Sequence, residues 1–373
     1  MSYFLAFAGF AALIILHEFG HFAAAKAVGM RVERFALFFP PLVAKWRPKG
    51  SETEYAVGAI PLGGYVKITG MNPEEELAPE VAHRAYCRQP VWKRVVVISA
   101  GPIVNIVLAF LILWVLFASR PLQFSQAVVE RVEDDSPAQG VLQPGDRLLS
   151  ADGVAGFEEG ISADEGADRV EALREAIATH GCVGTPREGC EATKPVELVV
   201  LRDGERRALE VVPRYSEEAD RLLIGFTFGT RGVDIGVGEA AQRSVTGMWT
   251  VTTLTVDRIV SLFFSADARE DVSGVVGSYE ATRQSFEFDT VRAVSILALI
   301  SLSLGIINLF PFLPLDGGHI FWAVAEKVRG RAISLRVMER ASIVGFMLVL
   351  FLFYVGLSND IGRLSSGEGF GVR

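Results

Sequence analysis

The sequence predicts a polytopic α-helical membrane protein with four transmembrane helices, a membrane-associated β-hairpin region and an inserted extracytoplasmic β-rich domain. Three observations predict this fold. Hydrophobic residues make up 50% of the chain and the mean hydropathy is +0.34. The apolar residues are concentrated in four long runs, and one long polar segment separates the second run from the third. A chain of 373 residues has room for more than one domain.

The four apolar runs are long enough to serve as membrane-spanning helices. Residues 1–25 contain no acidic or basic side chain other than Glu18, apart from histidines, and the runs 95–117, 293–312 and 341–357 are uncharged. A bilayer core requires about 20 apolar residues. A buried helix of a soluble protein is the alternative for each run, and the length of 95–117 argues most strongly against it. The first run lacks a basic leader and a cleavage site of small residues, which predicts a retained helix rather than a signal peptide.

Basic residues beside the runs predict the orientation in the membrane, because Lys and Arg are enriched on the cytoplasmic side. Segment 31–94 carries ten of them and the connection 318–340 carries five. Segment 121–290 has 16 basic and 31 acidic residues. We therefore expect a multi-pass protein of the cell inner (cytoplasmic) membrane whose two basic connections are cytoplasmic. Both termini and the acidic segment would then be extracytoplasmic.

The expected organisation follows the chain in seven segments. These are a first transmembrane helix at 1–30, a cytoplasmic-side β-hairpin and loop region at 31–94, a second transmembrane helix at 95–119, an extracytoplasmic domain at 120–215, an extracytoplasmic linker with an amphipathic helix at 216–290, a third transmembrane helix at 291–320, and a cytoplasmic connection, fourth transmembrane helix and short tail at 321–373. Glycines and a proline divide 54–68, which predicts a β-hairpin or a loop-forming strand pair in that stretch, close to the membrane surface. The amphipathic helix is expected at Ser244–Phe264, on the outer membrane surface or on the helix bundle, because its two charges argue against a fifth span.

Cys182 and Cys190 form a disulfide in one reading and remain thiols in the other.

The first apolar run contains the sequence His17-Glu18-Phe19-Gly20-His21. Residues four apart lie on one face of a helix, so both imidazoles can reach one metal ion. Glu18 lies beside them and can act as the general base that takes a proton from water. Ionisable side chains inside a membrane are costly and usually functional. The pattern therefore predicts a Zn2+ site for hydrolysis within the bilayer.

Two histidines leave a catalytic zinc site incomplete, because such sites normally have three protein ligands and one open position. Asp316 follows the third run directly, in a proline-broken stretch that ends in two glycines. Counting about 1.5 Å per helical residue places it at the same membrane depth as His17. We expect Asp316 to be the third ligand and His319 to be an interfacial polar residue. Asn308 is expected to bind the substrate backbone, and Asn105 to join neighbouring helices.

Taken together, these motifs resemble the site-2 protease family of intramembrane zinc metalloproteases, in particular its bacterial RseP-like branch with a PDZ domain. The resemblance covers nearly the whole chain and is carried by HEFGH at 17–21, Gly58–Lys67, Gly101–Asn105, Ser136–Gly153 and Asn308–Gly317. It implies that His17, His21 and Asp316 bind zinc and that Glu18 is the general base. It also implies that the outer domain is PDZ-like and acts as a size filter or sensor.

The resemblance further implies that the chain cleaves transmembrane segments of single-span membrane proteins. Anti-sigma factors and remnant signal peptides are the expected substrates, often after an upstream site-1-type protease has trimmed them. The expected partners are thus these substrates and the lipid bilayer, and the chain carries no nucleic-acid signature.

Two other readings stay open at this point. One is a catalytically inactive membrane scaffold whose PDZ-like domain binds extracytoplasmic C-termini, which the intact His-Glu and Asp-Gly motifs argue against. The other is a metal transporter, which requires a path of several intramembrane acidic or histidine sites where the sequence has one cluster.

Overall fold

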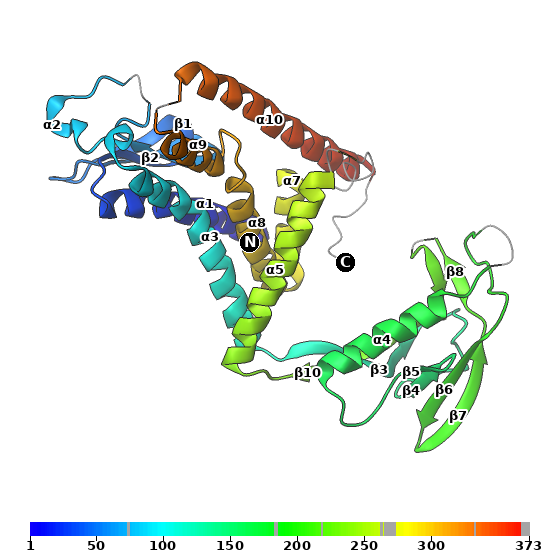
Figure 1. The fold of residues 1–373 in the computed structure, drawn as a ribbon. Helices are drawn as coiled ribbons and strands as arrows, with labels where there is room; N and C mark the ends of the chain where they lie inside the picture. Colours follow the sequence, from blue (N-terminus) through cyan, green and yellow to red (C-terminus); the bar gives the residue numbers. More distant parts are fainter. Residues whose placement is uncertain are drawn as a thin grey trace. The chain divides into compact units, whose positions relative to one another are not determined.

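The structure is a computed structural model in which two compact units are distinguished (Figure 1). Unit 1 consists of Met1–Leu116 together with Val237–Arg373, and unit 2 consists of Phe117–Gly236. The residues that the structure describes are 1–72, 75–182, 186–217, 219–261, 264, 274–331 and 333–366. Unit 2 is therefore an insertion between two parts of the chain that pack together.

Four helices among the described residues are long and apolar enough to cross a membrane. They are α1 (Ser2–Ala27), α3 (Val91–Ser119), α8 (Thr290–Asn308) and α10 (Leu335–Ser366). Each one overlaps one of the four apolar runs, so the prediction of four candidate spans is confirmed. The third helix was predicted at 291–320 but ends at Asn308, before Pro311 and Pro314, whose ring nitrogens cannot donate to a continuing helix. Between 11% and 39% of each apolar stretch is buried inside the protein. The remaining apolar surface suits a lipid environment.

A small sheet follows α1 and consists of β1 (Val32–Trp46) and β2 (Glu54–Ile68) in antiparallel pairing. Residues 34–37 of β1 have partners in both 54–57 and 64–67 of β2. The middle of β1 therefore lies between the two arms of β2.

The antiparallel pair of β1 and β2 lies within the β-hairpin region predicted at 31–94. A hairpin inside 54–68 alone is not found, because both arms of β2 pair with β1 and not with each other. Paired positions skip Pro40 and Pro41 in β1, where the ring nitrogen has no hydrogen to donate. The apolar run of β1 lacks the alternation that identifies a strand facing water on one side, which is why the sequence did not reveal it.

Five further helical elements are found among the described residues of unit 1. They are α2 (Pro79–Ala82), the 3-10 helix η1 (Tyr86–Arg88), α5 (Val237–Ser261), α7 (Val275–Phe288) and α9 (Asp316–Arg329). α7 contacts α1, α8 and α10, and α5 contacts α8. The buried carboxylate of Asp360 in α10 accepts hydrogen bonds from the main-chain N–H groups of Gly274 and Gly277, at the start of α7. The amphipathic helix expected at 244–264 begins earlier than predicted, and residues 262 and 263 lie outside the described part.

Unit 2 is a mixed α and β unit with a sheet in the order β10-β3-β4-β6-β7, in which β5 also pairs with β4. Its strands are β3 (Leu122–Val132), β4 (Arg147–Ala151), β5 (Val154–Ala155), β6 (Val196–Arg202), β7 (Glu205–Val211) and β10 (Phe226–Val233), and β8 (Arg214–Ser216) pairs separately with β9 (Arg221–Leu223). The helix α4 (Ala163–Ala178) begins after the N-cap residue Ser162, whose hydroxyl accepts a hydrogen bond from the Glu165 N–H.

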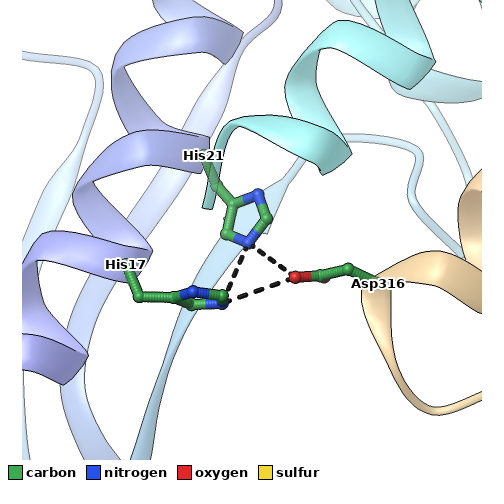
Figure 2. A group of neighbouring side chains, drawn as sticks. All are labelled: His17, His21 and Asp316. Carbon is green, nitrogen blue, oxygen red and sulfur yellow. Dashed lines mark hydrogen bonds and ion pairs between the residues drawn. The ribbon is translucent and has the colours of Figure 1, made fainter. Parts of the chain in front are cut away.

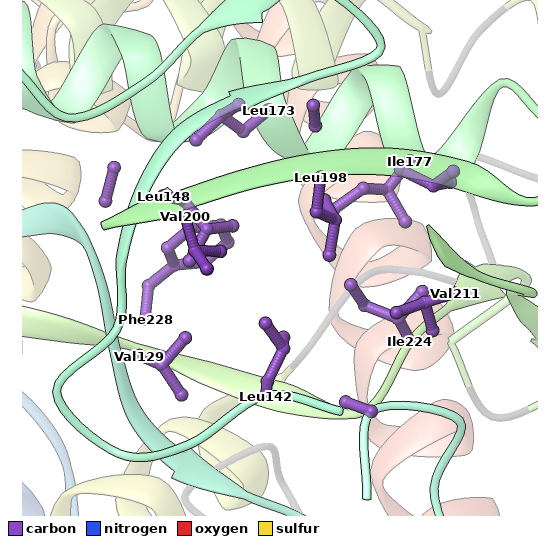
Figure 3. Packing of buried hydrophobic residues seen from close by; sticks show 14 of the residues in the cluster. Val129, Leu142, Leu148, Leu173, Ile177, Leu198, Val200, Val211, Ile224 and Phe228 are labelled. Atoms are coloured by element: carbon purple, nitrogen blue, oxygen red, sulfur yellow. The ribbon is translucent and has the colours of Figure 1, made fainter. Parts of the chain in front are cut away.

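The core of unit 2 lies between α4 and the sheet (Figure 3). Val129, Leu148, Leu173, Leu198 and Val200 are among its buried members, and they come from β3, β4, α4 and β6. Burying such side chains contributes about 1.5–3 kcal/mol each relative to leaving them exposed. The alternating burial of β6 places its apolar residues on this side.

An ion pair closes one end of this core. Arg202 donates to both carboxylate oxygens of Asp146, at 2.7 and 2.6 Å. Burial by itself would raise the pKa of Asp146, but hydrogen bonds from Arg202 and from the Gln143 N–H outweigh it and lower that pKa. The pair therefore stays ionised near neutral pH.

The structure differs from the predicted domain boundary at residue 215. β10 lies beyond this boundary, yet it pairs with β3 at the start of the unit. A pairing between the two ends of a domain leaves no local signal, so the sequence assigned β10 to a linker. The structure also joins Cys182 and Cys190 in a disulfide.

Candidate metal centre and active site

His17, Glu18 and His21 lie on α1, and Asp316 is the first residue of α9 (Figure 2). The side chains of both histidines are directed toward the carboxylate. Both histidines are buried, with exposed fractions of 8% and 7%. The helical spacing of four residues thus places two imidazoles on the face of α1 that meets the start of α9.

The segment between α8 and α9 brings Asp316 to this place. It contains Leu313 and Pro314, joined by a cis peptide bond. A Cβ added at Gly317 would lie 2.1 Å from the main-chain oxygen of Leu309, and one added at Gly318 would lie 2.5 Å from the nitrogen of Leu313. Only glycine allows the backbone to pack on itself this closely. The two glycines after Asp316 are therefore required by backbone packing, whereas Asp316 itself offers the carboxylate.

Three ligand atoms meet at nearly equal distances. The Nε2 atom of His17 lies 3.4 Å from Oδ2 of Asp316 and 3.4 Å from Nε2 of His21, and the latter lies 3.2 Å from the same Oδ2. Atoms bound at about 2.0–2.2 Å to a tetrahedral zinc ion stand about 3.3–3.6 Å apart. The observed spacings fit this set of ligands.

The buried carboxylate oxygen provides a second test. Asp316 Oδ2 is buried and has no hydrogen-bond partner among the described residues. A buried polar atom without a partner is rare in native proteins and calls for an ion or water. The residues present therefore fit a zinc ion held by two imidazoles and one carboxylate.

The helix α3 packs against the two histidines through one stripe of residues spaced by four. His21 Nδ1 lies 2.9 Å from the main-chain oxygen of Val97, and His17 Nδ1 lies 3.2 Å from Nδ2 of Asn105. Between them, a Cβ added at Gly101 would lie 2.3 Å from His21 Nε2. The contacts of Val97 and Gly101 with the histidines were not predicted from the sequence. The shared spacing of four residues on α1 and α3 was the available signal.

The sheet approaches the site from another side. A Cβ added at Gly64 of β2 would lie 2.8 Å from Cγ of Glu18. Glu18 is partly buried and lies next to the two histidines in α1. The backbone of β2 therefore passes directly over the side chain that the sequence predicts to be the general base.

The other predicted polar residues are placed as follows. Asn308 ends α8, and its Nδ2 donates to the main-chain oxygen of Leu304 in the same helix. His319 lies in the first turn of α9 and is partly buried. Neither is part of the three-ligand cluster found among the described residues.

Comparison with known proteins identifies the family. The model of the peptidase family M50 matches residues 5–352. The chain belongs to peptidase family M50. Members of this family are zinc-dependent site-2 proteases that act on membrane substrates within the bilayer, so the chain is a membrane zinc metalloendopeptidase.

Similar proteins occur in several bacteria, and each is named "Putative zinc metalloprotease". The M50 chain is 30% identical to a protein of Rhizobium meliloti over 94% of both chains. It is 31% identical to a protein of Nostoc sp., covering 94% of this chain and 93% of the relative. It is 29% identical to a protein of Brucella suis, covering 94% and 92%. The similarity thus extends over both units.

Proposed function

We propose that the protein is an intramembrane endopeptidase that cleaves transmembrane segments of single-span membrane proteins. The observation that carries the proposal is the cluster of His17, His21 and Asp316, in which the two histidines, with Glu18 beside them, lie on a helix that is apolar enough to span a bilayer. The buried Oδ2 of Asp316 and the spacing of the three ligand atoms support zinc at this place.

The proposed mechanism divides the work between the metal and the side chains. Bound zinc supplies Lewis acidity, which polarises a peptide carbonyl and lowers the pKa of a water to about 7. Glu18 accepts the proton of the attacking water and passes it to the amide nitrogen that leaves. Asp316, His17 and His21 hold the ion, and their burial keeps bulk water from competing for it.

The substrate must be unwound before it is cut, because a helix hides its peptide bonds in internal hydrogen bonds. We infer that an unwound segment adds as an extended strand to the sheet of β1 and β2, whose main-chain groups are the natural partners. The close approach of Gly64 to Glu18 supports this, since a strand on that sheet would run beside the general base. Asn308 would hold the substrate backbone from the side of α8.

The orientation and the partners are part of the proposal. The basic connections would face the cytoplasm, and unit 2 with both termini would lie outside the inner membrane. Anti-sigma factors and remnant signal peptides, trimmed first by a site-1-type protease, are the substrates that suit this arrangement.

Unit 2 would act as a PDZ-like filter or sensor. A cavity of about 500 Å³ between β3 and α4, lined partly by Ser125, Arg147 and Arg231, supports binding of an extended peptide there.

The test compares the wild type with Glu18→Gln in detergent or liposomes, using a single-span substrate. Glu18→Gln should keep its zinc, measured by metal analysis, and lose about 10²–10⁴-fold of the cleavage rate. His17→Ala should lose both zinc and cleavage. If Glu18→Gln cleaved as fast as the wild type, the mechanism would fail. If the wild type held zinc but cut no substrate, the scaffold alternative would be favoured.

A further inference from the structure

In both histidines of the proposed zinc site, Nε2 faces the ligand cluster and the other ring nitrogen, Nδ1, contacts a polar group of α3. For His21 this group is the main-chain oxygen of Val97, at 2.9 Å. A carbonyl oxygen only accepts hydrogen bonds, so His21 Nδ1 carries the proton and its Nε2 lone pair faces the ligand cluster. The tautomer that a metal ligand needs is thus set for His21 by the backbone.

For His17 the corresponding group is the side-chain amide of Asn105, at 3.2 Å. An amide can present either its oxygen or its nitrogen, and the hydrogen-bond network decides which one. With Nδ2 toward His17, Oδ1 of Asn105 is buried without a partner. In that orientation His17 Nδ1 accepts, and the proton sits on Nε2, which is the atom that faces Asp316. This tautomer would block His17 as a ligand.

Turning the amide removes the conflict over the tautomer of His17. Oδ1 then accepts from His17 Nδ1–H, and the Nε2 lone pair is free toward Asp316 and His21. Metal-bound histidines almost always donate the other ring N–H to an oxygen, and this contact orients the ring and raises its basicity.

We propose that Asn105 is a positioning residue for the zinc ligand His17, acting as the acceptor that selects its tautomer. The inference rests on the proposed function, because it takes His17 to be a ligand. It also gives Asn105 more than the helix-joining role that the sequence suggested.

Contacts from α8 hold Asn105 in place for this task. Asn105 is 0% exposed, and the hydroxyl of Ser301 donates to its main-chain oxygen at 2.9 Å. A Cβ added at Gly305 would lie 3.4 Å from Cβ of Asn105, so α8 approaches α3 closely at this level. The contacts of α8 thus hold α3 in place, and Asn105 of α3 orients the ligand His17 on α1.

The experiment measures the zinc dissociation constant of the full chain in detergent by competition with a chromogenic chelator. Asn105→Leu keeps the approximate shape and removes the acceptor, and we expect its Kd for zinc to rise about 10–100-fold. Asn105→Asp keeps an acceptor oxygen and should bind zinc close to the wild type. Ser99→Ala is the matched control, because it removes a polar side chain of the same helix whose hydroxyl donates only to main-chain oxygens of α3 itself. Its Kd should equal that of the wild type.

The melting temperature of the metal-free protein separates positioning from packing. A positioning role predicts that Asn105→Leu weakens zinc binding while the metal-free protein melts as the wild type does. Asn105→Ala makes the same comparison if the leucine variant does not accumulate. The inference is overturned if variants without the acceptor bind zinc with the wild-type Kd, or if only the melting temperature falls. A wild type that bound no zinc would overturn the proposed function as well, which distinguishes the two failures.

Discussion

Replacing Gly101 by alanine tests whether α3 shapes the proposed zinc site by its closeness to His21. The added methyl group would lie 2.3 Å from His21 Nε2, 2.6 Å from Cε1 and 2.8 Å from Cδ2. Uncharged heavy atoms in contact prefer about 3.5–4.0 Å. Either the ring or the helix must therefore move by roughly 1 Å, since the new atom sits against the face of the imidazole.

A movement of this size is large for a metal ligand. Ligand distances in a functional site are held to about 0.2 Å, and a misplacement of about 1 Å can reduce activity about 10²-fold. We expect Gly101→Ala to weaken zinc binding by about 10²-fold and to reduce cleavage at least as much. Overpacking should also lower the free energy of unfolding by about 1–3 kcal/mol.

The assay measures zinc content, zinc Kd and cleavage of a single-span substrate for purified variants. Gly247→Ala is the matched control, because Gly247 also lies in a helix of unit 1 and no atom lies within 4 Å of its added Cβ. Alanine is favoured over glycine in a helix by about 1 kcal/mol, so this control should keep its zinc and its activity.

The reasoning is refuted if Gly101→Ala binds zinc with the wild-type Kd and cleaves at the wild-type rate. If Gly101→Ala lowered the free energy of unfolding but kept the wild-type Kd for zinc, α3 would have moved away while His21 stayed in place. That result would leave the site without the close contact on which the prediction depends.

Two further predictions concern charged groups away from the zinc site. Asp146→Asn should destabilise unit 2 by about 3 kcal/mol. The Arg202 side chain is only 12% exposed, and the substitution would leave its charge buried without an opposite charge. Faster hydrogen exchange at β4 and β6 in the full chain would reveal this, and unchanged protection would contradict it. Hydrogen bonds from Arg84, and then from Lys26, lower the pKa of Glu52 from 4.5 to about 2. A lowered pKa stabilises the fold above pH 4.5 and ceases to do so as the pH falls from 4.5 to about 2. Since the Glu52 side chain is 30% exposed, solvent screening reduces this to roughly 1 kcal/mol; Glu52→Gln should melt below the wild type at pH 7 and together with it near pH 2, and a constant difference across this range would refute the assignment.

Local patterns were enough for the parts of the protein that depend on one segment at a time. The four apolar runs became α1, α3, α8 and α10 because length and hydropathy are properties of a single helix. The pairing of His17 with His21 follows from helical periodicity alone. Asp316 could be proposed from its place directly after an apolar run, and the structure brings it within 3.4 Å of both histidines.

Pairings between distant segments were beyond these patterns. The arms of β2 pair with β1, and β10 pairs with β3 across nearly the whole of unit 2. A strand shows which of its faces is apolar, but its sequence carries no local mark of the strand that will lie beside it. The sequence therefore placed a hairpin within 54–68 and ended the inserted domain at 215, and the structure corrects both.

The sequence by itself determined which residue types could bind and activate a metal, and it predicted that they meet at one membrane depth. Only the tertiary structure decided how the ligands are held. The oxygen of Val97, the missing side chain of Gly101 and the amide of Asn105 lie against the two histidines because α3 packs on α1 there. The first two contacts depend on a backbone atom and on the absence of a side chain, and neither of these gives a chemical signal in a sequence of side chains. Asn105 stands out in the sequence as a polar residue in an apolar run, but its neighbour His17 lies on another helix.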